Sequence, residues 1–426
     1  MSELAVILGD SVAGTLTRLR GGRPRFDYED DYGAGTPLSL SMPVQVRSHA
    51  SGVVVPWLWG LLPDNEAVLR RWARQFHASA ASPLSMLSTP VGEDCAGAVR
   101  FAKPDDLDRV LARSGAVTWL DEHDVAARLR ELKEDATAWL GRDFTGQFSL
   151  AGAQAKTALL RSGGRWGVPS GATPTTHILK PAVAGLDDHG LNEHLCLDAA
   201  RRAGLIAART AVSRFRDETA VVVTRYDRVE RDGGVVRVHQ EDLCQALSVS
   251  PDRKYENEGG PGVERIAALF RDAMPAREAE LAVRRFADAL IWNWLITGTN
   301  AHAKNYSLLL AGDQVRLAPL YDIASALPYP EAHVRRLRFA MKLGGDYPVE
   351  LWQNPWPRVA RELRVDAEEL SARADDLAQR APDAFADAAR EPQVTALARP
   401  LPATLADLVA DRAGRCRERL ARSARS

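Results

Sequence analysis

The order of apolar and polar positions divides the chain into a β-rich part followed by a mainly helical part. Short apolar runs separated by Gly- and Pro-containing turns fill residues 1–50, with 36–46 as the last run, and predict a small antiparallel sheet. Apolar residues at helical spacing predict helices at 62–76 and 118–135. The second of these carries acidic residues near its start, where the helix dipole favours them.

From about residue 144 to 245 the pattern is mainly that of strands, with one helix predicted at 191–205. From about 246 onward it is mainly helical, and the most apolar helix, 279–298, is expected to be central. A β-rich lobe followed by a helical lobe predicts an α+β fold with two lobes and a cleft where they meet. The expected domains are a β-rich N-terminal subdomain, a helical connector, a β lobe and a helical lobe, at 1–108, 109–143, 144–245 and 246–426.

The composition is that of an ordinary globular protein. The 426 residues are 46% hydrophobic and 26% charged, which suits two or three domains. A net charge of −1 argues against a surface coated with phosphate-binding charge, and so against DNA binding by this chain alone. The longest apolar runs are shorter than the ~20 residues that span a bilayer, and the acidic start lacks the basic stretch of a signal peptide. The four cysteines form no CxxC pair, so buried thiols in a reducing cytoplasm are expected.

Lysine is rare in this chain. Of the 55 basic residues only seven are lysine, and the other 48 are arginine. A chain that uses arginine wherever any positive charge serves keeps lysine for sites that need a compact ammonium group, such as a contact to phosphate. Three of the seven, Lys156, Lys180 and Lys304, fall in segments that carry other signs of function.

The first such segment is FSLAGAQAKT, residues 148–157. Small side chains at 151–153 let backbone N–H groups approach an anion, and Lys156 adds a positive charge. The segment is not a Walker A motif, because Ala155 stands where that motif has glycine and the following residues predict a β-hairpin instead of a helix. A strand–turn–strand loop that covers phosphates and an ordinary hairpin turn both remain open.

Lys180 lies in the apolar strand HILKP, and a lysine on a buried strand needs a partner. It could reach the phosphates of a nucleotide, with Glu193 on the next helix as its carboxylate partner. The alternative is an edge-strand lysine whose ammonium group reaches solvent. The following loop, 182–194, is expected to help select a protein substrate.

Three polar residues, Gln240, Glu241 and Asp242, stand where an extended run meets the helical region. Groups at such a junction can bind the adenine or ribose of a nucleotide. Equally, acidic residues there can form the capping turn that opens a helix.

Asn305 and Asp322 lie beside two apolar runs that the turn AGDQ separates, which predicts a hairpin with both side chains towards the same end. An amide and a carboxylate together offer the hard oxygen atoms that suit Mg²⁺ carrying a triphosphate. The alternative is a helix-capping Asn and an unrelated turn Asp.

These parts occur in the order that a protein kinase uses: phosphate loop, strand lysine, hinge, catalytic loop and metal-binding carboxylate. The order predicts a two-lobed protein-kinase-like fold, with an extra N-terminal subdomain before the β-rich N-lobe and an all-helical C-lobe. A P-loop NTPase is the alternative class of enzyme, in which nucleotide hydrolysis would depend on Lys156 and not on Asp322.

The sequence resembles the HipA family of bacterial toxin kinases along nearly its whole length. The similarity lies in PLSLSMPV, LLPDN and GEDCAGAVR, and then in FSLAGAQAKTALL, HILKP, NEHLC, RYDR, HQEDLCQALSVSPDRKYENEGGPG, NAHAKNYSL and LAPLYDIASA. The resemblance implies phosphorylation of protein serine or threonine with ATP and Mg²⁺, with aminoacyl-tRNA synthetases among the family's targets and growth arrest and persistence as the outcome. It also implies a partner, a small helix-turn-helix antitoxin (HipB-like) that binds operator DNA.

The resemblance assigns roles by position. Asn305 and Asp322 would hold Mg²⁺, with His302 and Lys304 in the catalytic loop. Ser149 matches the family's autophosphorylation site, where a phosphate of roughly −1.5 to −2 charges would repel the ATP phosphates and switch the enzyme off. Glu193 would pair with Lys180. The implied ATP-binding residues are Leu150, Ala151, Gly152, Ala153, Gln154, Lys156, Lys180, Gln240, Glu241 and Asp242.

The departure from the family pattern is Asn300, which stands where the family has the aspartate that accepts the substrate's proton. An amide can orient a hydroxyl group but has no useful basicity near neutral pH. Losing a general base costs roughly 10²- to 10⁴-fold in rate. We favour a deliberate Asp-to-Asn substitution that inactivates a kinase. A natural pseudokinase, which would bind ATP and antitoxin as a co-repressor, and a different base remain open; Asp288 is the nearest other carboxylate, about three turns upstream.

Overall fold

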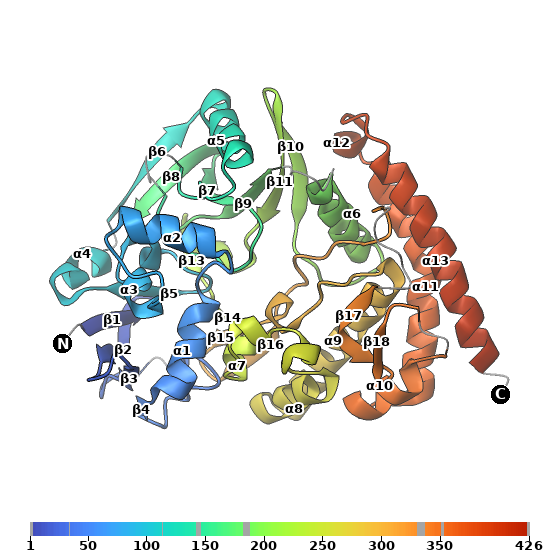
Figure 1. Cartoon of the computed structure of the whole chain (residues 1–426), viewed down its shortest axis with the longest axis horizontal. Helices are drawn as coiled ribbons and strands as arrows, with labels where there is room; N and C mark the ends of the chain where they lie inside the picture. Colours follow the sequence, from blue (N-terminus) through green and yellow to red (C-terminus); the bar gives the residue numbers. More distant parts are fainter. Residues whose placement is uncertain are drawn as a thin grey trace. The chain divides into compact units, whose positions relative to one another are not determined.

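The computed structural model describes residues 3–33, 35–112, 114–141, 146–181, 188–329, 337–350 and 353–423. The chain folds into two compact units. Unit 1 comprises Met1–Gly185, Ser213–Asp252 and Ser307–Val315, and unit 2 comprises Leu186–Val212, Arg253–Tyr306 and Arg316–Ser426. Most strands belong to unit 1 and most helices to unit 2, which confirms the α+β class (Figure 1). The bounds of the four expected domains stay a prediction.

The N-terminal part of unit 1 is a five-stranded antiparallel sheet in the order β4-β3-β2-β1-β5, and strands β1 to β4 confirm the small antiparallel sheet predicted for residues 1–50. Helices cover it, and Trp57 and Trp72 are fully buried in its core. The helix predicted at 62–76 is α2, which Asn65 caps through bonds from Ala67 N and Val68 N. The elements are β1 Glu3–Leu8, β2 Ser11–Arg18, β3 Pro24–Tyr28, β4 Ser48–His49, α1 Ser51–Gly60, α2 Glu66–Gln75, α3 Pro83–Leu87, β5 Val99–Ala102 and α4 Leu107–Leu111.

The segment 36–46 is not the strand that its alternating pattern predicts. It forms only an isolated bridge between Ser39 and Met42. Pro37 and Pro43 lack the N–H group that a strand ladder needs, so the segment cannot pair along its length.

The second part of unit 1 is a six-stranded sheet in the order β10-β11-β9-β7-β8-β6. Buried residues of α5 pack against it. The helix predicted at 118–135 was wrong at its start, because residues 118–120 belong to the edge strand β6, and Asp121 opens α5 with a capping box. The elements are β6 Gly115–Leu120, α5 Glu122–Glu134, β7 Thr157–Ser162, β8 Arg165–Gly171, β9 His177–Pro181, β10 Thr210–Phe215 and β11 Glu218–Thr224.

Two smaller sheets complete the strands of this region. The hairpin predicted around AGDQ is present as β15 and β16, in a three-stranded sheet of order β14-β15-β16. β12 and β13 form a separate two-stranded sheet. The elements are β12 Arg228–Arg231, β13 Gly234–Arg237, β14 His239–Asp242, α7 Leu243–Ala246, β15 Ser307–Ala311 and β16 Gln314–Leu317.

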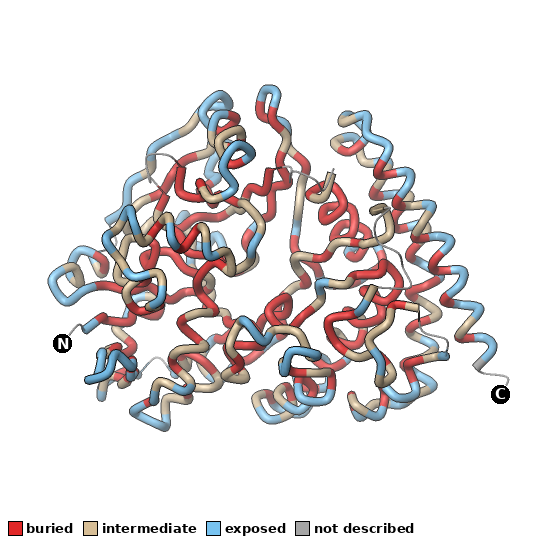
Figure 2. The backbone as a smooth tube through the Cα atoms, viewed as in Figure 1, coloured by how far each residue is buried: buried red, intermediate tan, exposed pale blue. Residues whose placement is uncertain are grey.

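Unit 2 is built around α9, the apolar helix that the sequence predicts to be central. Trp292 and Trp294 are fully buried, and Figure 2 shows burial along much of this helix. The helix predicted at 191–205 is α6, which belongs to this unit. The unit also contains the small sheet of β17 and β18, so it is mainly helical and not all-helical as predicted. The elements are α6 His189–Arg202, α8 Val263–Ala273, α9 Ala276–Ile296, β17 Arg338–Leu343, β18 Asp346–Pro348, α10 Trp356–Leu363, α11 Ala367–Ala389, α12 Pro392–Thr395 and α13 Leu401–Ser423.

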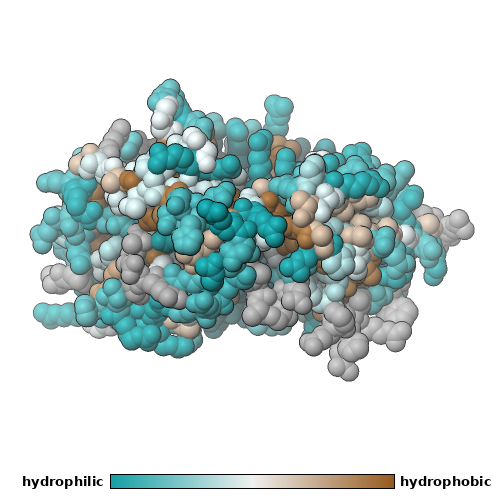
Figure 3. Space-filling view, turned by 90° about the horizontal axis from the view of Figure 1, so that it is seen from above, coloured by the Kyte–Doolittle hydropathy of each residue, from teal (hydrophilic) through white to brown (hydrophobic). Residues whose placement is uncertain are grey.

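The surface and the thiols agree with the composition. On the face drawn in Figure 3, hydrophilic residues predominate. All four cysteines are free and buried, as predicted. Among the helices of the described residues, none combines the length and the apolar character needed to cross a bilayer.

Candidate active site

The end of α9 and the loop after it position the polar residues of unit 2. The helix ends where Thr297 takes a left-handed conformation, with φ of 58°. Gly298 then donates its N–H to the carbonyl oxygen of Asn293. A Cβ atom on Gly298 would lie 2.1 Å from Asn293 Oδ1, so any other residue here would require the buried Asn293 side chain to move.

Asn305 and Asp322 line one pocket, and Asn300 lines it as well. This confirms that the hairpin brings the two residues to the same end. Asn305 donates from Nδ2 to the carbonyl oxygen of Asn300 at 2.7 Å, so its amide oxygen is the atom left to accept a cation. With the Asp322 carboxylate, the pocket therefore has the hard oxygen donors that fit Mg²⁺.

Hydrogen bonds fix the Asp322 segment to the loop that follows α9 and to α6. Tyr321 donates to the carbonyl oxygen of Lys304 at 2.6 Å. Ser325 donates from Oγ to the carbonyl oxygen of Ile296 at 2.6 Å, and its backbone exchanges two bonds with the side chain of Asn192 on α6. Asp322 itself has φ of 55°, a strained conformation that aspartate tolerates better than most residues.

A hydrogen bond from a tyrosine orients the side chain of Asn300. Tyr255 donates from its hydroxyl to Oδ1 of Asn300 at 2.8 Å, and its ring packs edge-on against His302 with centroids 4.8 Å apart. The other candidate base, Asp288, does not line this pocket. Arg373 binds both of its carboxylate oxygens, at 2.8 and 2.9 Å.

The loop before β7, in unit 1, has features that suit an anion. The predicted strand before it is a single bridge between Ser149 and Cys95. Gly152 has φ of 99°, and a Cβ atom there would lie 2.7 Å from Nζ of Lys156. Lys156 donates to the carbonyl oxygen of Ala151 at 2.6 Å, and the buried Nε2 of Gln154 has no hydrogen-bond partner. An anion could approach the backbone closely at Gly152, and the ammonium group of Lys156 and the amide of Gln154 are hydrogen-bond donors. These features suit phosphate oxygens.

Lys180 lies on β9, between β11 and β7, so the edge-strand alternative was wrong. The register pairs Thr157 of β7 with Leu179 of β9, so Lys180 lies one residue beyond this pair and Lys156 immediately precedes β7. The three lysines singled out by the sequence, Lys156, Lys180 and Lys304, are 5–7% exposed, and the other four are not buried.

The side chains of β14 contact protein groups. Gln240 donates to Asp227 at 3.0 Å and accepts from the Tyr226 hydroxyl. Asp242 forms the capping box at the start of α7, which confirms the alternative prediction of a helix-capping turn. Glu241 accepts from Leu40 N at 2.8 Å. A role in nucleotide binding would therefore fall to the backbone of β14.

Other predicted residues are buried or belong to different units. Ser149 is fully buried, and its hydroxyl donates to the carbonyl oxygen of Leu61 at 2.7 Å. Glu193 is buried on α6 in unit 2, whereas Lys180 belongs to unit 1, so their pairing stays a prediction. The convergence of Lys180 with Asn305 and Asp322 stays a prediction for the same reason. Of the expected substrate loop 182–194, residues 182–187 lie outside the described residues.

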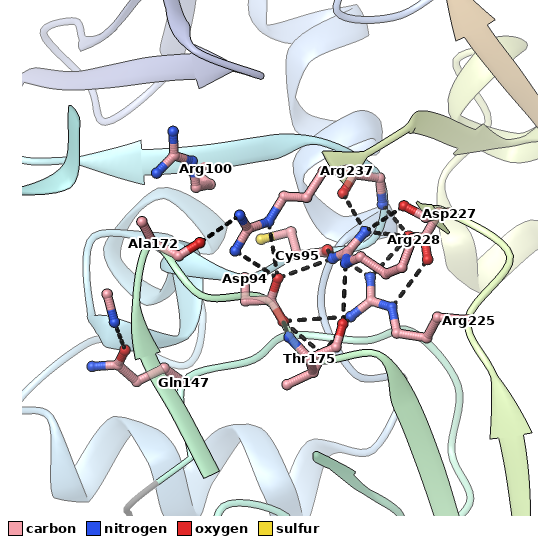
Figure 4. A network of polar contacts seen from close by, with 12 residues as sticks. Asp94, Cys95, Arg100, Gln147, Ala172, Thr175, Arg225, Asp227, Arg228 and Arg237 are labelled. Carbon is pink, nitrogen blue, oxygen red and sulfur yellow. Dashed lines mark hydrogen bonds and ion pairs between the residues drawn. The ribbon is translucent and has the colours of Figure 1, made fainter. Parts of the chain in front are cut away.

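A buried charge network fixes the RYDR segment of unit 1 (Figure 4). Arg225 and Arg228 both bind Asp227, and Arg228 donates to Asp94 at 2.9 Å. Burial alone would raise the pKa of Asp94, but Arg228, Arg237 and Arg225 outweigh it and lower the pKa to about 2. The network joins the segment before β5 to the entrance of β12.

Comparison with known proteins gives the family. Residues 148–385 match the HipA-like C-terminal domain, and residues 4–102 match the HipA N-terminal domain. The chain belongs to the HipA family. Among relatives, "Putative kinase Y4mE" of Sinorhizobium fredii (strain NBRC 101917 / NGR234) is 32% identical over 83% of this chain and 84% of its own length.

Two further HipA comparisons agree. The serine/threonine-protein kinase toxin HipA of Shewanella oneidensis is 26% identical over 70% of this chain and 69% of its own. The solved complex of Shewanella oneidensis MR-1 HipA, HipB and operator DNA contains a chain with the same fold, with a TM-score of 0.83, 23% identity and 99% coverage of both chains. The kinase-like two-lobed fold class is thereby confirmed.

Sequence reasoning missed the residues that position the site. Tyr255 bonds to Asn300 in the loop after α9, and Asn192 bonds to Ser325 in the Asp322 segment. Neither residue was singled out. A buried asparagine inside the apolar helix sequence LNEHLC was the one local sign, because a buried amide needs partners. For Tyr255 the sequence offers no comparable sign.

Proposed function

We propose that this chain is a kinase toxin of a toxin–antitoxin system, which transfers the γ-phosphate of ATP to serine or threonine of a target protein. The observation that carries the proposal is the pocket shared by Asn300, Asn305 and Asp322. It combines two oxygen ligands for a cation with the position from which a protein kinase takes the substrate's proton.

Each part has a chemical role in the proposal. Asn305 and Asp322 hold Mg²⁺, which neutralises the phosphate oxygens and orients them. Lys156, Lys180 and the backbone of residues 150–154 bind the phosphates, and the backbone of β14 binds adenine. His302 and Lys304 belong to the catalytic loop, and Glu193 holds Lys180 in place. In this proposal the protein needs no covalent intermediate, because positioning and charge supply the catalysis.

Asn300 limits the activity of this chain. Its Oδ1 accepts the Tyr255 hydroxyl, and an amide nitrogen cannot accept a proton from the substrate. A carboxylate in its place could accept the same bond with one oxygen and use the other as the base. We therefore propose that Asn300 leaves the binding site intact and reduces transfer by roughly 10²- to 10⁴-fold.

Ser149 is the proposed autophosphorylation site and off switch. Its hydroxyl is buried and bonded to Leu61, so phosphorylation requires the loop to leave its present position. The resulting charge could not return to a buried site without a partner.

The partners follow from the family. We propose a HipB-like helix-turn-helix antitoxin, operator DNA bound through that antitoxin, and a protein substrate for which an aminoacyl-tRNA synthetase is the first candidate. The Shewanella complex, which contains HipA, HipB and operator DNA, supports the first two.

The test is the Asn300→Asp variant with γ-labelled ATP and mass spectrometry of Ser149. We expect label on Ser149 in this variant and little or none in the unmodified chain. The Asn300→Asp, Asp322→Ala double variant is the control and should lose both Mg²⁺-dependent ATP binding and labelling. If Asn300→Asp takes up no label, the kinase proposal fails.

A second function remains because the chain has Asn300. A natural pseudokinase would bind ATP and antitoxin as a co-repressor and transfer no phosphate in either form. Tight antitoxin binding without labelling of Asn300→Asp would favour it.

A further inference from the structure

The strand β14 is attached to the N-terminal domain of unit 1 through the carboxyl group of Glu241. This side chain is 1% exposed. Its Oε2 lies 2.5 Å from the Ser39 hydroxyl, and its Oε1 accepts the backbone N–H of Leu40 at 2.8 Å. Both oxygens of one buried carboxyl group are therefore held by two consecutive residues about 200 positions earlier in the chain.

The contacts continue on both sides of Glu241. Ser39 and Ser41 share a hydrogen bond of 2.7 Å, and Ser41 donates to the carbonyl oxygen of Gln245 at 3.1 Å. His239, at the start of β14, bonds through Nε2 to the carbonyl oxygen of Leu38 at 3.0 Å. The segment 38–41 thus holds β14 at its start, at Glu241 and in the first turn of α7.

The structure of 36–46 explains why it can do this. Because the two prolines prevent strand pairing, the hydroxyl groups and one N–H group of this segment are free to bond β14. Buried polar groups that are all satisfied rigidify the segments they join and select one conformation.

We propose that the Ser39–Leu40 turn is a positioning element for the nucleotide: it fixes the backbone of β14, so that the N-terminal domain sets the affinity of the chain for ATP. The inference rests on the proposed function, in which the β14 backbone binds adenine. It gives Ser39, Leu40 and the N-terminal domain that contains them a role in ATP affinity. In this proposal they neither touch the nucleotide nor take part in phosphoryl transfer.

The chemistry of the contact shows which substitution should preserve it. Burial raises the pKa of Glu241 to about 8 against the opposing effect of the bonds from Leu40 and Ser39, and the neighbouring Asp242 raises it further. When Glu241 is ionised, the Ser39 hydroxyl donates to its Oε2. When Glu241 is the neutral acid, Oε1 still accepts from Leu40 N, Oε2 carries the proton and donates to the Ser39 oxygen, and the Ser39 hydroxyl then donates to the Ser41 oxygen. Glutamine has the same arrangement of one acceptor and one donor.

The experiment measures ATP dissociation constants with Mg²⁺ by calorimetry for the full chain and its variants, with thermal unfolding alongside. We expect Ser39→Ala and Glu241→Ala to weaken binding ~3- to 10-fold, the loss typical of one or two buried hydrogen bonds. Glu241→Gln should bind within about 2-fold of the unmodified chain.

The matched control is Glu218→Ala, which removes another buried glutamate of unit 1, bonded to Lys133 at 2.7 Å. It should lower the melting temperature and leave ATP affinity unchanged. If Glu241→Ala does not fold, Ser39→Ala carries the test, because it removes only a hydroxyl group.

The outcomes separate the two proposals. If the unmodified chain binds no ATP, the proposed function fails and this inference with it. If it binds ATP and Ser39→Ala binds equally well, only the inference fails. An equal loss of affinity in Glu218→Ala and Glu241→Ala would also overturn it, since general destabilisation would then explain both.

Discussion

At the scale of single residues, the activity of the candidate site depends on whether the side chain at position 300 can accept a proton. Asn300 accepts from Tyr255, which in turn packs on His302. A carboxylate at this position would accept the same phenolic O–H, and such a bond favours the ionised form of the acid. Tyr255 would then both orient the base and keep its pKa low enough for it to be ionised near neutral pH.

Tyr255→Phe in the Asn300→Asp protein should therefore lower labelling about 3- to 10-fold, because a charge-assisted hydrogen bond is lost. It should also move the acidic limb of the pH–rate profile to higher pH, since the base loses its donor. Initial rates of label uptake between pH 5 and 9 measure both effects.

The control for that variant is Tyr347→Phe, which removes a hydroxyl group from a ring that lies beside Arg338 and Lys342, each 5.4 Å from its centre. It should leave rate and profile unchanged. An unshifted profile in Tyr255→Phe would show that the phenol does not act on position 300.

At the scale of elements, the sequence predicted those helices and hairpins that the local pattern of apolar and polar residues determines. The hairpin of β15 and β16 follows from two apolar runs around a turn, and it brought Asn305 and Asp322 into one pocket as expected. Helix α2 followed from its apolar spacing, but it begins at Glu66, after the capping Asn65, and not at Leu62 as predicted. Three of the seven lysines were singled out because they lie in segments with other signs of function, and these are the three that the fold buries.

What the sequence could not predict depends on distant partners. Residues 118–120 form an edge strand only because β8 pairs with them, although their own pattern continues a helix. The segment 36–46 alternates like a strand, yet its polar groups bond Glu241 and Gln245 far along the chain. Tyr255 and Asn192 act in the site through similar long-range bonds, which no local pattern reveals.

The charge network around Asp94 makes a prediction about the stability of unit 1. Asp94→Asn leaves buried arginines without their carboxylate and should lower the free energy of unfolding by about 3 kcal/mol. The half-exposed pair of Arg25 and Asp27 is the control, and Asp27→Asn should cost less than about 1 kcal/mol. Denaturant titrations at neutral pH measure both.

The pH dependence of the Asp94 contribution has a definite sign. The folded pKa of about 2 lies below the ordinary value of 3.8, so the stabilisation is complete above 3.8 and is lost as pH falls towards 2. The difference in stability between the unmodified chain and Asp94→Asn should therefore shrink over that range. A constant difference would contradict the assignment.

Glu241 should have the opposite pH dependence. Its folded pKa, raised by burial from 4.5 to about 8, means that the unfolded chain releases this proton first. Its contribution is therefore most favourable below pH 4.5 and decreases as pH rises towards 8. Glu241→Gln should remove this decrease, so melting temperatures measured from pH 5 to 8 should fall less steeply in the variant.

Other groups near Glu241 must be separated from this effect. Asp242 and Tyr28 interact electrostatically with it, and burial lowers the pKa of His239 to about 4. The His239 contribution is present in both proteins and cancels when the two melting curves are subtracted. Asp242 and Tyr28 are coupled to Glu241, so the difference between the curves reports Glu241 together with these two groups. Parallel curves for the unmodified chain and Glu241→Gln would show that Glu241 does not titrate in this range.

At the scale of the whole molecule, the balance of charge determines how the chain can meet DNA. Its net charge is −1, and the basic residues of the C-terminal helix α13 are not a free patch. Five arginines of this helix form ion pairs with acidic side chains: Arg412 and Arg419 with Glu350, Arg415 with Asp411, Arg417 with Asp375, and Arg422 with Glu418. Paired arginines release few counterions, so they favour a solvated helix face over a nucleic-acid arm.

The chain alone should therefore not bind operator DNA at about 150 mM salt, whereas its complex with the proposed HipB-like antitoxin should. In that proposal the antitoxin makes the phosphate contacts, so the slope of log affinity against log salt should be equal for antitoxin and complex. Arg417→Ala and Arg422→Ala should leave that slope unchanged, as measured by fluorescence anisotropy from 50 to 300 mM salt. A slope that falls by about one for either substitution would instead place that arginine on a phosphate and assign α13 to the DNA interface.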